Sequence, residues 1–263
     1  MSDRGAAVRE GNSTADRALA ILEMFSHERP VLSARELAAG LGVARSTAYR
    51  YLQTLVSAGY LREGADGGFQ LGGKIVELAE VARGRHHLVD LAAPRMTTIA
   101  TRFGQTVLLT KLVAGTILCV EQEDPPAQFV RLSYRRGGQM ALNAGASALV
   151  CVAWLETARL DALLREHTLT AISASTITDE DAFRARLAAV REDGYVVTRG
   201  EVDAEGMGIA VPIFDPAGSV LAGLSVVGLQ ARIPEGDVPS IIDALRDASE
   251  GAAAGLDLYS LSR

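Results

Sequence analysis

The chain has 263 residues, 48% of them hydrophobic, and carries a net charge of −6. It lacks the run of about 18 apolar residues that a membrane span requires, and its polar first residues lack a signal-peptide core, so we expect a cytoplasmic protein. Cys119 and Cys151 are too few for a disulfide framework and are expected to stay reduced.

Residues 14–72, which follow a polar arm over 1–13 that we expect to be disordered, are predicted to form a winged helix-turn-helix. After a first helix over 14–26, Ser33 and Glu36 stand at capping-box spacing and can bond free amides at the start of a second helix. Glycines then allow a sharp turn into a third helix, and Asp66-Gly67-Gly68 joins two alternating stretches as a hairpin. This order is typical of DNA-binding domains.

The third helix is predicted to have one apolar and one polar face. Its apolar residues fall at i, i+4, i+7 and i+8 and define a buried side: Ala48, Leu52, Leu55 and Val56. Its polar residues can reach base edges and phosphates from the major groove. The residues that we expect at the DNA are Ser33, Arg45, Ser46, Thr47, Tyr49, Arg50, Gln53 and Arg62. The alternative is a small three-helix bundle with an ordinary solvated face.

The rest of the chain favours a linker helix over 73–87 and a second, α+β domain over 88–263. Helices are expected at 88–103, 144–166, 179–193 and 237–258, and strands at 105–113, 116–123, 128–134, 195–200, 207–214 and 219–228. Thr178 is expected to cap the third of these helices. Asp215-Pro216-Ala217-Gly218 suits a type I turn between the last two strands.

Over roughly residues 14–260 the chain resembles the IclR-type transcriptional regulators. The segments that carry the resemblance are ARSTAYRYLQTLVSAGYL, FQLGGKIVELA, GQTVLLTKL, GGQMALNAGASALVCVAWL and VREDGYVVTRGEVDAEGMGIAVPIFDPAGSVLAGLSVVG, in that order. The resemblance implies an N-terminal winged helix-turn-helix that a linker helix joins to a GAF-like effector domain. It also implies homodimers that bind double-stranded DNA at a pseudo-palindromic operator, sometimes pair into tetramers, and respond to small organic or aromatic acids.

The resemblance further implies an effector pocket. Its residues would be Asn143, Ala144, Gly145, Ala146 and Ser147, together with Phe129, Leu132, Met207, Ile209, Ser225 and Val227. Small residues at a helix start let a ligand approach backbone amides, which favour an anion. Many family members have Gly-Lys in place of Ala148-Leu149, a cysteine near Ile209 and a serine near Val227. These differences make the pocket more apolar, and plain core packing is the alternative for each of these residues.

Two functions from different classes follow. One is a regulator, which we expect to be a repressor, whose operator affinity an organic acid controls. The other is an enzyme acting on a small acid, with the N-terminal domain as a dimerisation module. Residues 1–85 carry a net charge of +1 and residues 86–263 one of −7, and only the first part suits a polyanion. We find no nucleophile–base pair, metal-ligand spacing or cofactor motif, so the regulator is favoured and no cofactor is expected.

Overall fold

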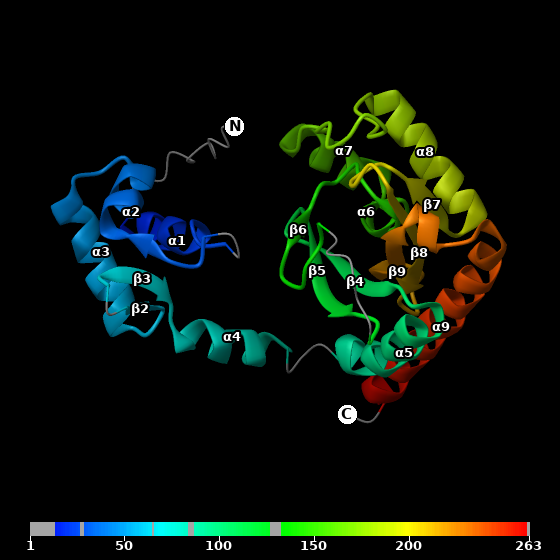
Figure 1. Cartoon of the computed structure of the whole chain (residues 1–263), viewed down its shortest axis with the longest axis horizontal. Helices are drawn as coiled ribbons and strands as arrows, with labels where there is room; N and C mark the ends of the chain where they lie inside the picture. Colours follow the sequence, from blue (N-terminus) through cyan, green and yellow to red (C-terminus); the bar gives the residue numbers. More distant parts are fainter. Residues whose placement is uncertain (1–13, 27–28, 65, 84–86, 127–132, 262–263) are drawn as a thin grey trace. The chain divides into compact units, whose positions relative to one another are not determined.

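The computed structural model describes residues 14–26, 29–64, 66–83, 87–126 and 133–261. The chain divides into two compact units, residues 1–85 and 86–263, which are taken one at a time below (Figure 1). The expected arm over 1–13 lies outside the described residues. Within the described part of the chain, no helix is long and apolar enough to cross a membrane.

The first unit contains four helices and a small sheet among its described residues. The helices are α1 (Thr14–Glu23), α2 (Ala34–Leu41), α3 (Arg45–Ser57) and α4 (Gly73–Arg83), and the strands β1 (Leu32–Ser33), β2 (Leu61–Glu63) and β3 (Gly68–Leu71) pair antiparallel in the order β1-β3-β2. Ile21, Leu37, Leu52 and Phe69 are fully buried between them. The predicted winged helix-turn-helix is therefore confirmed, although α1 ends at Glu23 rather than near residue 26.

Local sequence determines how α2 begins and ends. The Ser33 hydroxyl accepts a hydrogen bond from the Glu36 backbone amide at 3.2 Å, and the Glu36 carboxylate accepts one from the Ser33 backbone amide at 2.8 Å. This is the predicted capping box. Gly42 ends the helix with φ 64°, a left-handed conformation that glycine adopts without steric cost. These two signals set the angle at which α3 follows α2.

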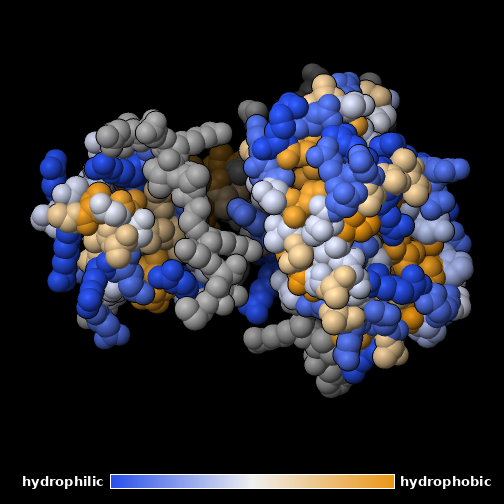
Figure 2. Space-filling model, turned by 90° about the horizontal axis from the view of Figure 1, so that it is seen from above, coloured by the Kyte–Doolittle hydropathy of each residue, from blue (hydrophilic) through white to orange (hydrophobic). Residues whose placement is uncertain are grey.

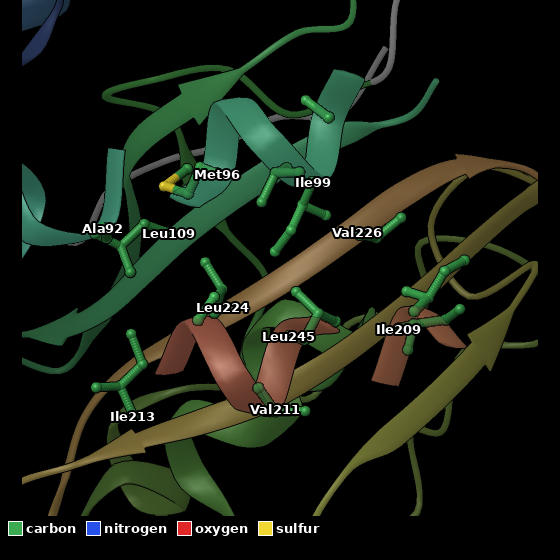
Figure 3. Close-up of a cluster of buried hydrophobic side chains, with 14 of the residues drawn as sticks. Ala92, Met96, Ile99, Leu109, Ile209, Val211, Ile213, Leu224, Val226 and Leu245 are labelled. Atoms are coloured by element: carbon green, nitrogen blue, oxygen red, sulfur yellow. The ribbon is translucent and has the colours of Figure 1, made fainter. Parts of the chain in front are cut away.

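The second unit is a six-stranded sheet with helices on both faces (Figure 1). The strands are β4 (Thr106–Val113), β5 (Thr116–Glu123), β6 (Gln139–Met140), β7 (Val196–Arg199), β8 (Gly206–Phe214) and β9 (Val220–Leu229), in the antiparallel order β6-β5-β4-β9-β8-β7. Helices α5 (His87–Phe103) and α9 (Val238–Leu261) cover one face, where Met96, Leu224, Val226 and Leu245 pack together (Figure 3). Helices α6 (Ala146–Val152), α7 (Thr157–Glu166) and α8 (Glu180–Asp193) cover the other.

Two local predictions in this unit are wrong. The single helix expected over 144–166 is two helices, because the chain turns at 153–156. There Arg191 donates to the Ala153 carbonyl, and the Trp154 ring meets Phe214 edge-on at 5.4 Å. The cap of α8 is Asp179, which accepts the Ala182 amide at 2.9 Å, rather than Thr178.

The strand expected at 128–134 lies mostly outside the described residues and stays a prediction there. Residues 128–132 lie outside the described part, and Ser133 and Tyr134 are not in a strand, while the short β6 lies further on. By contrast, the turn at Asp215–Gly218 is confirmed, since the Gly218 amide donates to the Asp215 carbonyl at 2.9 Å.

Candidate functional site

The outer face of α3 presents polar side chains to solvent. Arg45, Ser46, Arg50 and Gln53 are exposed, and Thr47 is half-buried. None of the ion pairs found among the described residues involves Arg45 or Arg50. Their guanidinium groups are thus available for an anionic partner, which for a helix of this kind is a phosphate or a guanine edge.

Tyr49 differs from its neighbours on that face. Its ring is half-buried and meets Phe69 of the wing edge-on, with ring centroids 6.2 Å apart. It therefore joins α3 to the hairpin as well as standing beside Arg50. A groove on α3 is lined by Tyr49 together with Thr14, Thr47, Arg50, Tyr51, Gln53 and Thr54. Tyr51 and Thr54 were not predicted there.

The two remaining expected DNA contacts, Ser33 and Arg62, do not line this groove. The Ser33 hydroxyl is engaged in the capping box and also donates to Glu36 at 2.8 Å, so it is not free for a phosphate. Arg62 is exposed on β2, opposite Gln70 of β3, where a wing can reach a DNA backbone.

A pocket opens in the second unit beside the start of α6. It is lined by Tyr134, Gly145, Ala146, Ser147, Thr198, Glu201, Val202, Asp203, Gly206, Met207, Gly208, Val227 and Gly228. The space inside it is only about 30 Å³, which is enough for one or two water molecules, so its own side chains largely fill it. Five of the residues expected in an effector pocket are among those that line it: Gly145, Ala146, Ser147, Met207 and Val227.

Side chains of neighbouring loops and strands already bond the amides at the start of α6. The Gly145 amide donates to the Glu201 carboxylate at 3.0 Å, and the Ala146 amide donates to the Thr198 hydroxyl at 3.1 Å. Gly145 has φ 85°, and a β-carbon there would lie 3.0 Å from the Tyr134 hydroxyl. This position therefore requires glycine for both conformation and space.

Asn143 stabilises a loop close to the pocket. Its side-chain amide donates to the Ile177 carbonyl at 2.6 Å and to the Thr170 carbonyl at 3.1 Å, which fixes the loop before α8. That loop in turn contacts the chain next to Glu201, since the Thr176 hydroxyl donates to the Glu201 carbonyl at 2.7 Å. Ala144 is fully buried. Neither Asn143 nor Ala144 lines the pocket.

The other expected effector residues lie elsewhere. Ile209 is on the opposite face of the sheet, within the cluster under α5 and α9 (Figure 3). Ser225 is fully buried and bonds Ser147 without lining the pocket. Phe129 and Leu132 lie outside the described residues.

Sequence reasoning missed Glu201, Thr198 and Tyr134. Glu201 lies in a turn between β7 and β8, where hydrophobic periodicity gives no signal. Burial raises the pKa of Glu201, and the Gly145 hydrogen bond and the charge of Arg186 partly oppose that rise. Burial also raises the pKa of Tyr134, reinforced by the charges of Asp203 and Glu201. The phenol therefore stays neutral.

A winged helix-turn-helix joined to a separate α+β unit is the architecture of a DNA-binding regulator. The family model for the IclR helix-turn-helix domain matches residues 14–64, and that for the bacterial transcriptional regulator IclR C-terminal region matches residues 81–253. The chain belongs to the IclR family of DNA-binding transcriptional regulators and is not an enzyme.

Individual relatives and solved structures agree with this assignment. The chain is 28% identical to the HTH-type transcriptional regulator KipR of Bacillus subtilis, over 90% of this chain and 94% of KipR. It is similar to the crystal structure of an IclR homolog from Microbacterium hydrocarbonoxydans complexed with 4-hydroxybenzoate, with 29% identity, a TM-score of 0.83 and coverage of 94% and 100%. A regulator structure from Alicyclobacillus acidocaldarius has 25% identity, a TM-score of 0.81 and coverage of 92% and 97%.

Proposed function

We propose that this protein is a repressor that binds a pseudo-palindromic operator as a homodimer and changes its operator affinity when a small organic or aromatic acid enters the pocket beside α6. The observation that carries the proposal is that pocket itself. Backbone amides lie at its wall, and it is in a different unit from the exposed arginines of α3.

Two relatives support the class of effector. The Microbacterium homolog was crystallised with 4-hydroxybenzoate, and a 25% identical relative is the p-hydroxybenzoate hydroxylase transcriptional activator of Acinetobacter baylyi. Val227, where many family members have serine, adds apolar surface to the pocket wall. We therefore expect a ligand with an apolar ring and one acidic group. The relatives include both signs of regulation, since YiaJ of Escherichia coli, 24% identical to this chain, is a DNA-binding transcriptional repressor and the Acinetobacter relative is an activator.

Exposed apolar residues support the homodimer. Val76, Leu78 and Val81 on α4 are 63%, 43% and 73% exposed, and Leu19 on α1 is 60% exposed. On the visible face of the larger unit, apolar residues are interspersed with hydrophilic ones (Figure 2). Leu78 and Val81, three positions apart, share one face of α4, and such an exposed apolar face is typical of a contact surface between subunits. A second interface could pair dimers into tetramers.

The direct test is operator selection followed by ligand release. The full chain should enrich a pseudo-palindromic sequence from random DNA, and benzoate or 4-hydroxybenzoate should then lower its affinity for that sequence. Enrichment of a single half-site would contradict the dimer, and an operator affinity that rises with the acid would contradict release of the operator by the effector. If a variant with a blocked pocket still binds both DNA and the acid, the effector binds elsewhere.

A further inference from the structure

Glu201 occupies the pocket at a defined position. Its carboxylate accepts the Gly145 amide at 3.0 Å, and its backbone carbonyl accepts the Thr176 hydroxyl at 2.7 Å. The side chain of Glu201 is thus bonded to the wall of the pocket, and its backbone is bonded to the loop before α8. At this distance the Gly145 N–H already forms a normal hydrogen bond with one acceptor.

The charges around Glu201 come from several elements. Asp203 lies in the same loop, Tyr134 precedes β6, and Arg186 of α8 acts on Glu201 electrostatically while its guanidinium donates to the Val197 carbonyl at 2.7 Å. Of the described residues that line the pocket, none is lysine, arginine or histidine. Two carboxylates therefore lie at the wall where an acidic ligand would have to bind.

We propose that the Glu201 carboxylate is an internal competitor for the acidic group of the effector, which reaches the Gly145 amide only when Glu201 releases it. This inference rests on the proposed function, because it requires an acidic effector. Two carboxylates cannot share one amide, and at that distance they also repel each other. Glu201 thereby favours neutral ligands over acids of the same shape when it is ionised.

Protonation of Glu201 weakens this competition. A neutral carboxylic acid is a poorer acceptor than a carboxylate and no longer repels an anion. Burial raises the pKa of Glu201 above the usual range of a glutamate, so the competitor is neutralised at a higher pH than an exposed glutamate would be. Affinity for an acid is therefore expected to rise as pH falls, while affinity for a neutral analogue stays constant.

The test compares benzoate with benzamide, a neutral molecule of nearly the same shape, by calorimetry on the full chain from pH 4.5 to pH 8. Benzoate should bind the wild type progressively more weakly as pH rises, by at most about tenfold per unit. Glu201→Gln should bind benzoate about tenfold more tightly than the wild type at pH 8, with little dependence on pH. Benzamide should not distinguish the two proteins. Glu205→Gln, which makes the same substitution at an exposed residue of the same loop that does not line the pocket, should keep the wild-type pH dependence.

Two different failures can be told apart. If benzoate binds the wild type and Glu201→Gln equally at every pH, or binds the variant more weakly, Glu201 does not compete with the acid. The proposed acid pocket is then unaffected. If neither protein binds benzoate at any pH, the proposed acid pocket and the competitor both fail. Glu201→Ala, which removes the acceptor altogether, replaces Glu201→Gln if that variant unfolds, and the same outcomes apply to it.

Discussion

The hydroxyls of Ser147 on α6 and Ser225 on β9 lie 2.6 Å apart, and both residues are almost completely buried. The Ser147 carbonyl also accepts the hydroxyl of Thr110 on β4 at 3.0 Å. These bonds fix the start of α6 on the sheet directly beside the pocket. The two serines therefore act as supports of the pocket, and a ligand would have to break a buried hydrogen bond to use Ser225.

Ser225→Ala should lower the free energy of unfolding by about 1–2 kcal/mol, because the Ser147 hydroxyl loses its buried partner. The double variant Ser147→Ala/Ser225→Ala should cost less than the sum of the two single changes. Urea unfolding followed by the fluorescence of Trp154, the chain's single tryptophan, reports on this unit. Strictly additive effects would show that the two hydroxyls are not coupled.

Val202→Trp should abolish benzoate binding and leave operator binding intact. Val202 lines the pocket from a loop and is only half-buried, so a large side chain can fill the cavity without displacing the core. Val202→Ala is the matched control and should still bind benzoate. Calorimetry and gel-shift titration measure the two activities. Normal benzoate binding by the tryptophan variant would move the effector site away from this pocket.

Arg50→Ala should weaken operator binding by about 1–3 kcal/mol if the guanidinium reads a base edge. Arg50 is exposed on α3 and forms none of the ion pairs found among the described residues, so its removal should not disturb the fold. Arg165→Ala removes an exposed arginine from α7 in the other unit and serves as control. Gel-shift titration at fixed salt compares the two. Equal affinities would exclude Arg50 from the interface.

The pKa of Glu201 also predicts how stability depends on pH. Because burial raises this pKa above 4.5, the stabilisation from the protonated form is complete below pH 4.5 and is lost as pH rises through the folded-state pKa. Glu201→Gln cannot ionise, so it should unfold at a higher temperature than the wild type at pH 8 and at nearly the same temperature at pH 4. Thermal melts across this range, with Asp203→Asn beside them, measure the difference. A Glu201→Gln variant that is less stable than the wild type at pH 8 would contradict the predicted direction of the pH dependence.

Local signals in the sequence predicted the parts of the fold that depend on neighbouring residues. Ser33 with Glu36 determines the start of α2, and Pro216 with Gly218 determines the turn before β9. The break between α6 and α7 has no glycine or proline, and it depends on contacts from Arg191 and Phe214, which are distant in the sequence. No local pattern could show it.

The pocket illustrates the same limit. Strand β8 is buried along almost its whole length, so alternation does not reveal which of its residues face α6 and which face α9. Ile209 lies on the α9 side for that reason. Glu201 is an isolated acidic residue in a turn, and only the fold brings it to Gly145, 56 positions away along the chain.

Leu78→Asp should convert dimers into monomers and weaken operator binding severely. Leu78 is 43% exposed on α4, on the same face as Val81, and a carboxylate there would be desolvated in any apolar contact between subunits. A single winged unit buries too little surface for tight specific binding, so loss of the second half-site should be visible as loss of affinity. Val113→Asp is the control, because it places the same charge on a valine that is 44% exposed at the end of β4. Sedimentation at micromolar concentration gives the state of each protein, and gel shift gives its affinity. A Leu78→Asp variant that remains dimeric would exclude this face of α4 as the contact, and a monomeric wild type that still recognises its operator would overturn the dimer itself.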